Sequence, residues 1–409
     1  MRVDKESVVT DTELLFNPFL PGFIDNPYPH YQRMRDLDPV HEHPLGFWMV
    51  TRYDDVSALL RANLSVEYRN LADGLVADQA TEINEAGTAL GRSMLDRDPP
   101  DHTRLRGLVA KVFTPKSIAA LEPKVTALVD ESLDRIAEQR TVDLIEALAF
   151  PLPFTVISEM LGTPPTDHVR LRELTGTLVR SLEVVVDEEV MRAIVAAEIE
   201  LTDMMRELIA WKRNNPADDL LTALIAANHD GDQLTDDELV SQVLLLYVAG
   251  HETTVNLIGN GVLALLRNPD QLALLRANPE LAANAIEEFL RYDSPVQQSR
   301  RITLAPHTLG GREIPAGMFV MAGLAAANHD ERHFGPDADK LRIDRENART
   351  QVSFGAGPHH CLGAALARLE GRAAISSLVS RFPNLSPNGD VEWNGRLNLR
   401  GAAKLPIVV

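Results

Sequence analysis

The only cysteine of the chain, Cys361, lies in a segment whose residue types could make its sulfur reactive. Residues 354–363 read FGAGPHHCLG, and the glycines and the proline keep this backbone open and bent. Residues 364–370 are strong helix formers, so we expect the sulfur at a helix N-terminus, where partial positive charge favours a thiolate. Such a thiolate is suited to bind a haem iron. The alternative is a buried, inert cysteine, which would not need an open loop.

Residues 249–254 (AGHETT) place an acid and two hydroxyls inside an otherwise apolar helix. Gly250 costs up to about 1 kcal/mol relative to alanine in a helix interior, and with Ala249 it leaves a notch where a ligand could touch the backbone. We expect the Thr253 hydroxyl to bond the carbonyl of one of these two residues and open the helix there. Glu252 beside it could supply protons. The alternative is a hydrogen-bond network with no catalytic role.

Two charged pairs have helical spacing. His102 and Arg106 are four residues apart after two prolines, so one helix face could grip a carboxylate. Glu288 and Arg291 are three residues apart and could form an ion pair. Glu288 and Arg291 could instead form an exposed contact worth about 0.3–0.5 kcal/mol. His102 and Arg106 could instead be two surface residues of an amphipathic helix. His359, in the cysteine loop, is interpreted as a donor to an anion beside a metal, because a structural zinc site needs four ligands.

The long helix that carries the acid and the hydroxyls has clear boundaries. Thr235 and Glu238 form a capping box, and the helix is predicted to run to Asn268, roughly 50 Å. Residues 243–248 are apolar on every face, so this helix should be buried. Residues 301–324 carry hairpin signals, which predict a small β portion.

The remaining elements are predicted from shorter patterns. Residues 46–52 are typical of a strand and residues 53–61 of a short helix. Residues 115–213 have a largely helical pattern, broken by prolines at 151–153 and 162–165. No repeat or long linker is present, so residues 1–409 are expected to form one catalytic domain.

Composition excludes several classes of protein. The 409 residues carry a formal net charge of −19 with a pI near 5.1, which disfavours nucleic acid or an anionic membrane surface as the partner. One cysteine excludes a disulfide framework. Residues 1–30 contain no apolar run for a signal peptide or membrane anchor, so we expect a cytoplasmic protein, kept monomeric by its charge.

These segments, in this order, resemble the cytochrome P-450 superfamily, the haem-thiolate monooxygenases, and specifically its soluble bacterial type. The loop matches F-x-x-G-x-[RH]-x-C-x-G at every fixed position, and residues 249–254 match the oxygen-activating helix. Arg301 lies where the family has a propionate-binding arginine, although Thr303 replaces the usual alanine. Residues 327–330 look like the family's Ala-Asn-x-Asp segment, and the matches run from about residue 98 to residue 370.

The resemblance implies a mainly α fold, with a large helical portion, a long central buried helix and a small β portion, and haem b as cofactor. It implies that Cys361 is the axial iron ligand, that Glu252 and Thr253 deliver protons, and that Glu288 and Arg291 form a buried structural pair. The haem contacts that it implies are His102, Arg106, Ala249, Gly250, Arg301, Phe354, Gly355, His359 and Cys361.

The implied reaction inserts one oxygen atom from O2 into an apolar or amphipathic small molecule, by hydroxylation or epoxidation. The substrate could be a polyketide, terpenoid, steroid or fatty acid. Residues 66–95 and 171–205 would line its pocket, and the tentative substrate contacts are Tyr247, Val248, Val296, Gln298, Ser299 and Asn398.

Electrons must come from outside, because the chain has no Gly-x-Gly-x-x-Gly motif. The resemblance implies a ferredoxin or flavodoxin with an NAD(P)H-dependent reductase. Lys111, Arg368 and Arg372 could form a basic docking patch on the thiolate side.

Two other functions stay open. A haem-thiolate peroxygenase would use hydrogen peroxide, but the intact Glu252 and Thr253 argue against it. A non-catalytic haem sensor or ligand carrier would be expected to lack that acid–alcohol pair or to carry an output domain, and neither feature is seen.

Overall fold

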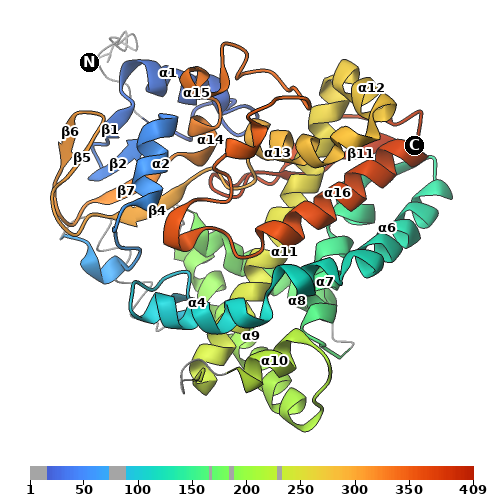
Figure 1. Ribbon diagram of the computed structural model, residues 1–409, viewed down its shortest axis with the longest axis horizontal. Coiled ribbons are helices and arrows are strands. Elements are labelled where there is room, and N and C mark those ends of the chain that lie inside the picture. The colour runs from blue at the N-terminus through green and yellow to red at the C-terminus, as the bar shows by residue number, and fades with distance from the viewer. Residues whose placement is uncertain (1–15, 73–88, 165–167, 184–187, 228–232) are drawn as a thin grey trace, which may run out of the picture.

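The computed structural model describes residues 16–72, 89–164, 168–183, 188–227 and 233–409. Most of these residues are helical (Figure 1). The α-helices within these ranges are α1 (Tyr28–Leu37), α2 (Tyr53–Arg61), α4 (Asp101–Val112), α5 (Pro115–Ala119), α6 (Glu122–Ala137), α7 (Pro151–Met160), α8 (His168–Leu178), α9 (Glu188–Asn214), α10 (Leu220–Ala226), α11 (Asp236–Arg267), α12 (Pro269–Ala277), α13 (Ala282–Tyr292), α14 (Leu324–Ala327), α15 (Glu331–Phe334) and α16 (Ala364–Arg381).

The β portion is small, and its main sheet lies at one end of the molecule, whereas β11 lies toward the other end (Figure 1). Its main sheet has the order β1-β2-β7-β4, in which only β2 and β7 are parallel. Three smaller groups are the β5–β6 hairpin, the sheet β3-β11-β8 and the pair β9–β10. The strands are β1 (Val40–Glu42), β2 (Phe47–Val50), β3 (Thr141–Asp143), β4 (Ser299–Ile302), β5 (His307–Leu309), β6 (Arg312–Ile314), β7 (Phe319–Ala322), β8 (Ser386–Pro387), β9 (Glu392–Trp393), β10 (Ala402–Lys404) and β11 (Pro406–Val408).

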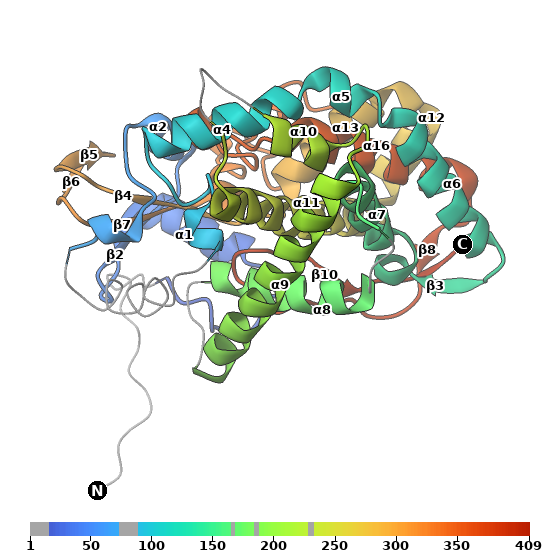
Figure 2. The same cartoon turned by 90° about the horizontal axis from the view of Figure 1, so that it is seen from below.

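Helix α11 runs through the middle of the fold, as both ribbon views show (Figures 1 and 2). Its predicted start is confirmed: the Thr235 hydroxyl accepts from the Glu238 amide, and the Glu238 carboxylate accepts from the Thr235 amide. Its last residue is Arg267, and Asn268 is the C-cap. The prediction of a long, central, buried helix is therefore correct.

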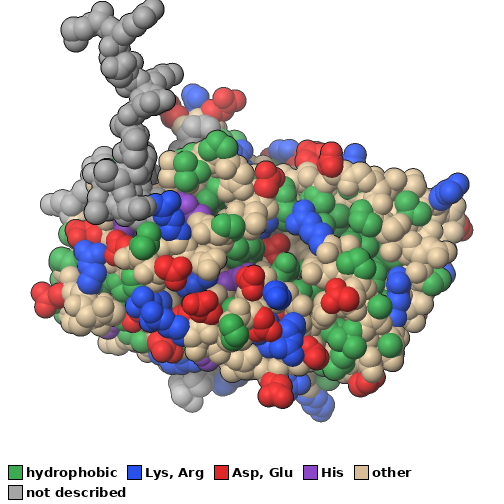
Figure 3. Space-filling view, turned by 90° about the horizontal axis from the view of Figure 1, so that it is seen from above, with side chains coloured by type: hydrophobic (Ala, Val, Ile, Leu, Met, Phe, Trp, Pro, Cys, Tyr) green, Lys and Arg blue, Asp and Glu red, His purple; other side chains and the backbone are tan. Residues whose placement is uncertain are grey.

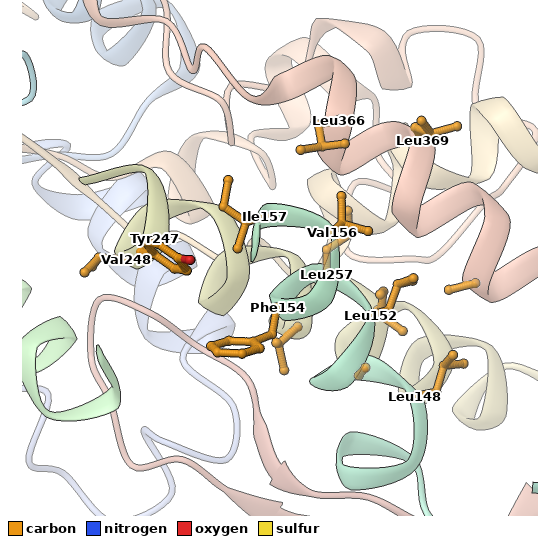
Figure 4. Packing of buried hydrophobic residues seen from close by; sticks show 14 of the residues in the cluster. Leu148, Leu152, Phe154, Val156, Ile157, Tyr247, Val248, Leu257, Leu366 and Leu369 are labelled. Atoms are coloured by element: carbon orange, nitrogen blue, oxygen red, sulfur yellow. The ribbon is translucent and has the colours of Figure 1, made fainter. Parts of the chain in front are cut away.

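The hydrophobic core forms around α11. Figure 4 shows Val156 and Ile157 of α7 among side chains from two other helices, Tyr247 and Val248 of α11 and Leu366 of α16. At about 25 cal/mol per Å² of apolar surface, burying each aliphatic side chain stabilises the fold by about 1.5–3 kcal/mol. This packing fixes α11 and α16 relative to each other, and the two helices carry the acid–alcohol segment and the cysteine loop.

The shorter patterns agree with the structure in most places. The hairpin signal at Gly310 and Gly311 is the β5–β6 turn, where both residues have positive φ angles of 53° and 81°. The predicted strand at 46–52 is β2, and the predicted helix at 53–61 is α2. Pro151 begins α7 after a π-helical turn, so that proline starts a helix and does not merely interrupt one.

The surface charge and the hydrophobicity of the helices bear on where the protein could bind. On the face drawn in Figure 3, acidic and basic side chains are interspersed. Within the described ranges, no helix combines the length and the hydrophobicity that a membrane span requires.

Candidate active site

A cavity of about 750 Å³ lies between α11 and the cysteine loop. Its walls are mainly apolar, and α11, α13 and α16 all contribute to them. Leucines of the lining include Leu245, Leu246, Leu257, Leu290, Leu324 and Leu366. Polar groups enter it at the middle of α11, at the edge formed by α4, β4 and the loop, and at Glu183 and Asn398. A mostly apolar chamber with a few convergent polar groups is typical of a small-molecule site.

Helix α11 is buried from Leu239 to Leu266 except at four residues in its middle, 249, 250, 252 and 253. Ala249, Gly250 and Thr253 line the cavity. A Cβ added to Gly250 would meet only Ile157, at an ordinary 3.5 Å, so the protein itself does not require glycine there. The break in burial therefore indicates that this stretch of the helix faces a ligand.

The two threonines of this stretch bond back to the helix. The Thr253 hydroxyl donates to the carbonyl of Ala249 at 2.9 Å, as predicted, and the Thr254 hydroxyl donates to the carbonyl of Gly250 at 3.3 Å. Because each hydroxyl uses its one proton in this way, the Thr253 oxygen keeps acceptor capacity toward the cavity.

Glu252 does not line the cavity in the described part of the chain. Its carboxylate pairs with Arg396, 144 residues further along the chain, and Glu252 Oε2 lies 3.9 Å from His251 Nε2. His251 Nδ1 donates to the carbonyl of Tyr247 at 2.8 Å, so Nε2 is the acceptor of the neutral ring. Burial lowers the pKa of His251 and keeps it neutral. Any proton that Glu252 supplied would therefore have to reach the cavity indirectly.

The cysteine loop is held in one shape by its glycines. Gly357 has φ +69°, and a Cβ there would lie 2.6 Å from the carbonyl oxygen of Leu60 at the end of α2. The Cys361 amide donates to the carbonyl of Phe354 at 2.8 Å, which closes the loop. Helix α16 starts directly afterwards, with Gly363 as its N-cap. The sulfur of Cys361 faces the cavity at the N-terminus of this helix, as the sequence predicts.

Opposing effects act on the pKa of the Cys361 thiol. Burial raises the pKa of its thiol above the usual 9.0, although the amides of Gly363 and Ala364 and the guanidinium groups of Arg106 and Arg368 lower it. Desolvation disfavours the charged form, whereas the helix terminus and the two guanidinium groups favour it. A metal ion bound to the sulfur would displace the thiol proton.

Four basic side chains meet at the edge of the cavity: His102, Arg106, Arg301 and His359. The rings of His102 and His359 lie 4.1 Å apart. Burial, then the neighbouring His102, Arg301, Arg106 and Arg300, lowers the pKa of His359 to about 3. Burial and Arg300 lower the pKa of Arg301 to about 10.

This basic cluster fits an anionic group. Among the described residues, no carboxylate forms an ion pair with Arg106 or Arg301, and His102 Nε2 is buried without a hydrogen-bond partner. Like charges crowded together and partly buried are costly unless an anion compensates them. Two carboxylates bound at this edge would compensate the positive charges and remove that free-energy cost.

Glu288 and Arg291 form a fully buried, bidentate ion pair, with distances of 2.7 and 2.8 Å. Arg291 also donates to three carbonyls, those of Asn328, Ala338 and Lys340, at 2.7–2.9 Å. The pair thus ties α13 to the chain segments that precede the cysteine loop.

Asn328, for which the sequence predicted no contact, continues this network. Its amide nitrogen donates to Ser294 and Ser353, at 2.9 and 2.8 Å, and its side-chain oxygen accepts from the Val352 amide at 2.9 Å. Residues 352–353 lead directly into the cysteine loop, so Asn328 helps to set the loop's position. In the sequence, only its place in the Ala-Asn-x-Asp segment indicated that Asn328 could have a structural role.

Comparison with known proteins identifies the family. The cytochrome P450 family model matches residues 184–398. Cytochrome P450 107B1 of Saccharopolyspora erythraea is 44% identical over 401 residues, covering 95% of this chain and 96% of the relative. The vitamin D(3) 25-hydroxylase of Pseudonocardia autotrophica is 41% identical over 400 residues, with 96% of each chain covered. The structure of cytochrome P450 PksS, from the bacillaene polyketide synthase of Bacillus subtilis 168, has a TM-score of 0.87 at 36% identity and covers 96% of this chain and 99% of that chain.

The chain belongs to the cytochrome P450 family. It is a P450 monooxygenase, of the soluble bacterial type, with the P450 fold and haem b as cofactor. The residues present fit that group. In the described part of the chain, no cluster of three His, Cys, Asp or Glu side chains could hold a metal ion by itself. A porphyrin supplies four nitrogen ligands, so the iron needs only the one sulfur that faces this cavity.

The predicted substrate contacts of this P450 divide into two groups. Val248, Val296, Gln298, Ser299 and Asn398 line the cavity. Tyr247 is buried and is absent from the described lining; it points toward Ser158 and Thr163.

The two predicted lining regions contribute less than expected. From 66–95, the lining includes Val66, Tyr68, Met94 and Leu95, while residues 73–88 lie outside the described residues. From the described part of 171–205, only residues 181–183 reach the cavity, because α8 and α9 pack their apolar faces against each other and against α11.

The predicted basic patch is partly neutralised. Arg368 pairs with Glu287 at 2.6 Å, and Arg372 pairs with Glu122 at 2.8 Å. Both arginines therefore carry less free positive charge than the sequence suggested.

Proposed function

We propose that this cytochrome P450 hydroxylates or epoxidises an apolar or amphipathic molecule of the size of a polyketide or a steroid. The observation that supports this best is the break in the burial of α11, which opposes Cys361 across a mainly apolar cavity. The names of two relatives, a vitamin D(3) 25-hydroxylase and a P450 of a polyketide synthase, agree with substrates of this kind. Val248, Val296, Gln298, Ser299 and Asn398 would contact the substrate.

Cys361 would hold the haem iron through its sulfur, with the amides of Gly363 and Ala364 directed at it. His102, Arg106, Arg301 and His359 would pair with the two propionates. Phe354 and Gly355 would lie against the ring on the sulfur side, and Ala249 and Gly250 on the opposite side. When bound, the haem supplies the redox chemistry that splits dioxygen and transfers one of its atoms to the substrate.

The reaction consumes two electrons and two protons for each oxygen atom inserted, and the second oxygen atom leaves as water. Thr253 would accept a hydrogen bond in the cavity, and Glu252 would pass protons toward it from the Arg396 side. This division of roles fits a hydroxyl inside the cavity and a carboxylate outside it.

A ferredoxin or flavodoxin, reduced by an NAD(P)H-dependent reductase, would supply the electrons on the side of Cys361. Lys111 and Arg372 are exposed on this side. An acidic carrier would have to compete with Glu122 for Arg372, and an exposed pair of this kind is worth at most about 1 kcal/mol. Arg372→Glu should therefore raise the dissociation constant of the ferredoxin at low salt. An unchanged constant would exclude this patch.

The whole chain, 1–409, would act as one catalytic domain, monomeric and cytoplasmic. The formal net charge of −19 supports a monomer, since like charges disfavour self-association.

The test is a spectral and turnover screen of the purified holoprotein. The reduced protein with carbon monoxide should give the red-shifted Soret band of a thiolate-bound haem. Vitamin D3, testosterone and myristic acid are suitable probes, and at least one apolar probe should shift the Soret band of the oxidised protein and be oxygenated with ferredoxin and NAD(P)H. Peroxide-supported turnover exceeding ferredoxin-supported turnover would indicate a peroxygenase instead.

A further inference from the structure

The acid of α11 is held by an arginine from the C-terminal part of the chain. Arg396 lies between β9 and β10, and its Nη1 pairs with Glu252 Oε1. Its Nη2 donates to the carbonyl of Gly176 in α8, at 3.2 Å. The two side chains of the pair are only 18% and 13% exposed. A partly buried, charge-assisted contact of this kind restrains Glu252 more firmly than a surface pair would.

The two residues that follow Arg396 are bound by the segment that follows α8. This wall segment consists of the 3-10 turn η4 (Val179–Leu182) and Glu183. The Glu183 carboxylate accepts from the amides of Leu397 and Asn398, at 2.6 and 3.2 Å. The Asn398 side chain donates to the carbonyl of Leu182 at 3.1 Å. The C-terminal turn, residues 396–398, is therefore fastened to the wall of the cavity.

Both sides of this contact face the substrate chamber. Leu182, Glu183 and Asn398 all line the cavity, whereas Glu252 and Arg396 are absent from its described lining. Asn398 is also bonded to the segment before β4, because its carbonyl accepts from the Gln297 amide at 2.8 Å. A molecule in the cavity thus touches the turn that carries Arg396 without touching the ion pair itself.

We propose that Arg396 is a positioning residue that couples closure of the cavity wall to proton delivery by Glu252. When the wall segment holds the C-terminal turn, Arg396 holds Glu252 in one orientation beside Thr253. When the wall segment moves away, the turn loses its bonds to Glu183 and Leu182, and Arg396 no longer fixes the carboxylate. Under this coupling, protons are supplied efficiently only when the cavity is filled and its wall is closed. This inference rests on the proposed function of Glu252 and Thr253.

The other groups that face Glu252 do not provide this coupling. His251 is on the same helix, is kept neutral by burial, and lies 3.9 Å away. Arg172 of α8 contributes charge but pairs with Glu146, at 2.8 Å. Among the described residues, only Arg396 forms an ion pair with Glu252 at hydrogen-bond distance and also belongs to a turn that the cavity wall binds.

The experiment compares Arg396→Gln, Glu183→Ala and the double variant with the wild-type holoprotein. Arg170→Gln is the matched control, because Arg170 is also on α8 but pairs with Glu200 at the surface. The probe is whichever of vitamin D3, testosterone and myristic acid gives the largest Soret shift. The readouts are product formed per NAD(P)H, the solvent deuterium isotope effect on product formation, and amide exchange of peptides covering 178–183 and 394–400.

Arg396→Gln should lower product per NAD(P)H between about twofold and thirtyfold and increase the isotope effect. Glu183→Ala should do the same although it does not touch Glu252, and the double variant should be little worse than either single one. Exchange of both peptides should accelerate in both single variants. Arg396→Lys, which keeps the charge but not both contacts, should recover part of the loss.

Two results would overturn the coupling. One is an Arg396→Gln variant that matches Arg170→Gln in product per NAD(P)H and isotope effect. The other is unchanged exchange of the 178–183 peptide when Arg396 is replaced, a readout that needs no turnover. Failure of the proposed function would look different, since the wild-type protein itself would then lack the thiolate spectrum or form no product.

Discussion

Replacing Arg291 with methionine tests whether the buried ion pair holds the fold behind the cysteine loop. The guanidinium is fully buried, and its loss leaves the Glu288 carboxylate with the weaker contacts to Arg345 and to the Arg342 amide, at 3.2 and 2.9 Å. The carbonyls of Asn328 and Ala338 also lose the donor that Arg291 provides. An unsatisfied buried acceptor costs about 1–3 kcal/mol, and breaking a buried pair costs about 3–5 kcal/mol. These effects overlap, so we expect a loss of about 4 kcal/mol in the free energy of unfolding.

The assay is urea unfolding of the holoprotein, followed by tryptophan fluorescence and by the Soret band. Arg372→Met is the control, because Arg372 pairs with Glu122 at the surface, where the two side chains are 45% and 56% exposed. It should lose less than about 1 kcal/mol. Arg291→Lys keeps a charge but not the bidentate geometry and should fall between the two. If Arg291→Met were no less stable than Arg372→Met, the buried pair would not be what holds α13 to the loop.

Three further predictions concern single side chains. Thr253→Ala should keep haem and the Soret shift with substrate but lower product per NAD(P)H about tenfold, with hydrogen peroxide formed instead; equal product per NAD(P)H would contradict the relay. Cys361→Ala should lose the thiolate carbon monoxide band, and an unchanged band would mean that another residue binds the iron. Burial raises the pKa of Glu370, whose two oxygens have no partner among the described residues, so the folded protein retains a proton that the unfolded chain releases above its ordinary pKa near 4.5. Stability should therefore fall as the pH rises above that value, by about 1.4 kcal/mol per unit up to the folded pKa, and Glu370→Gln should remove this slope in urea titrations at pH values above 4.5.

The parts of the fold that the sequence predicted depend on short-range signals. The capping box at Thr235 and Glu238 spans three residues, and the turn at Gly310 and Gly311 requires backbone angles that favour glycine. The pair of Glu288 and Arg291 is one helical turn apart. In each case the two partners are close in sequence, so the local geometry can be derived without knowing the fold.

The long-range contacts could not be predicted in this way. Arg396 lies 144 residues from Glu252, and Glu183 lies more than 200 residues from Leu397. Nothing in a polar C-terminal segment indicates which buried acid it will meet, because that depends on how β9, β10 and α8 pack around α11. The surroundings of the Cys361 sulfur show the same limit: the helix N-terminus is visible in the sequence, but the burial that raises the pKa of the thiol is a property of the assembled cavity.

Helix geometry nevertheless explains why the acid and the alcohol separate. Adjacent residues on an α-helix point about 100° apart. If Thr253 faces the cavity, Glu252 must face away from it, toward whatever covers that side of α11. A carboxylate in that position needs a cationic partner, because its side chain is mostly buried. The sequence therefore demands a basic residue from another element at this point, and the structure identifies it as Arg396. The proposed proton route and the proposed substrate chamber are for this reason built by different faces of one helix, and the C-terminal turn touches both.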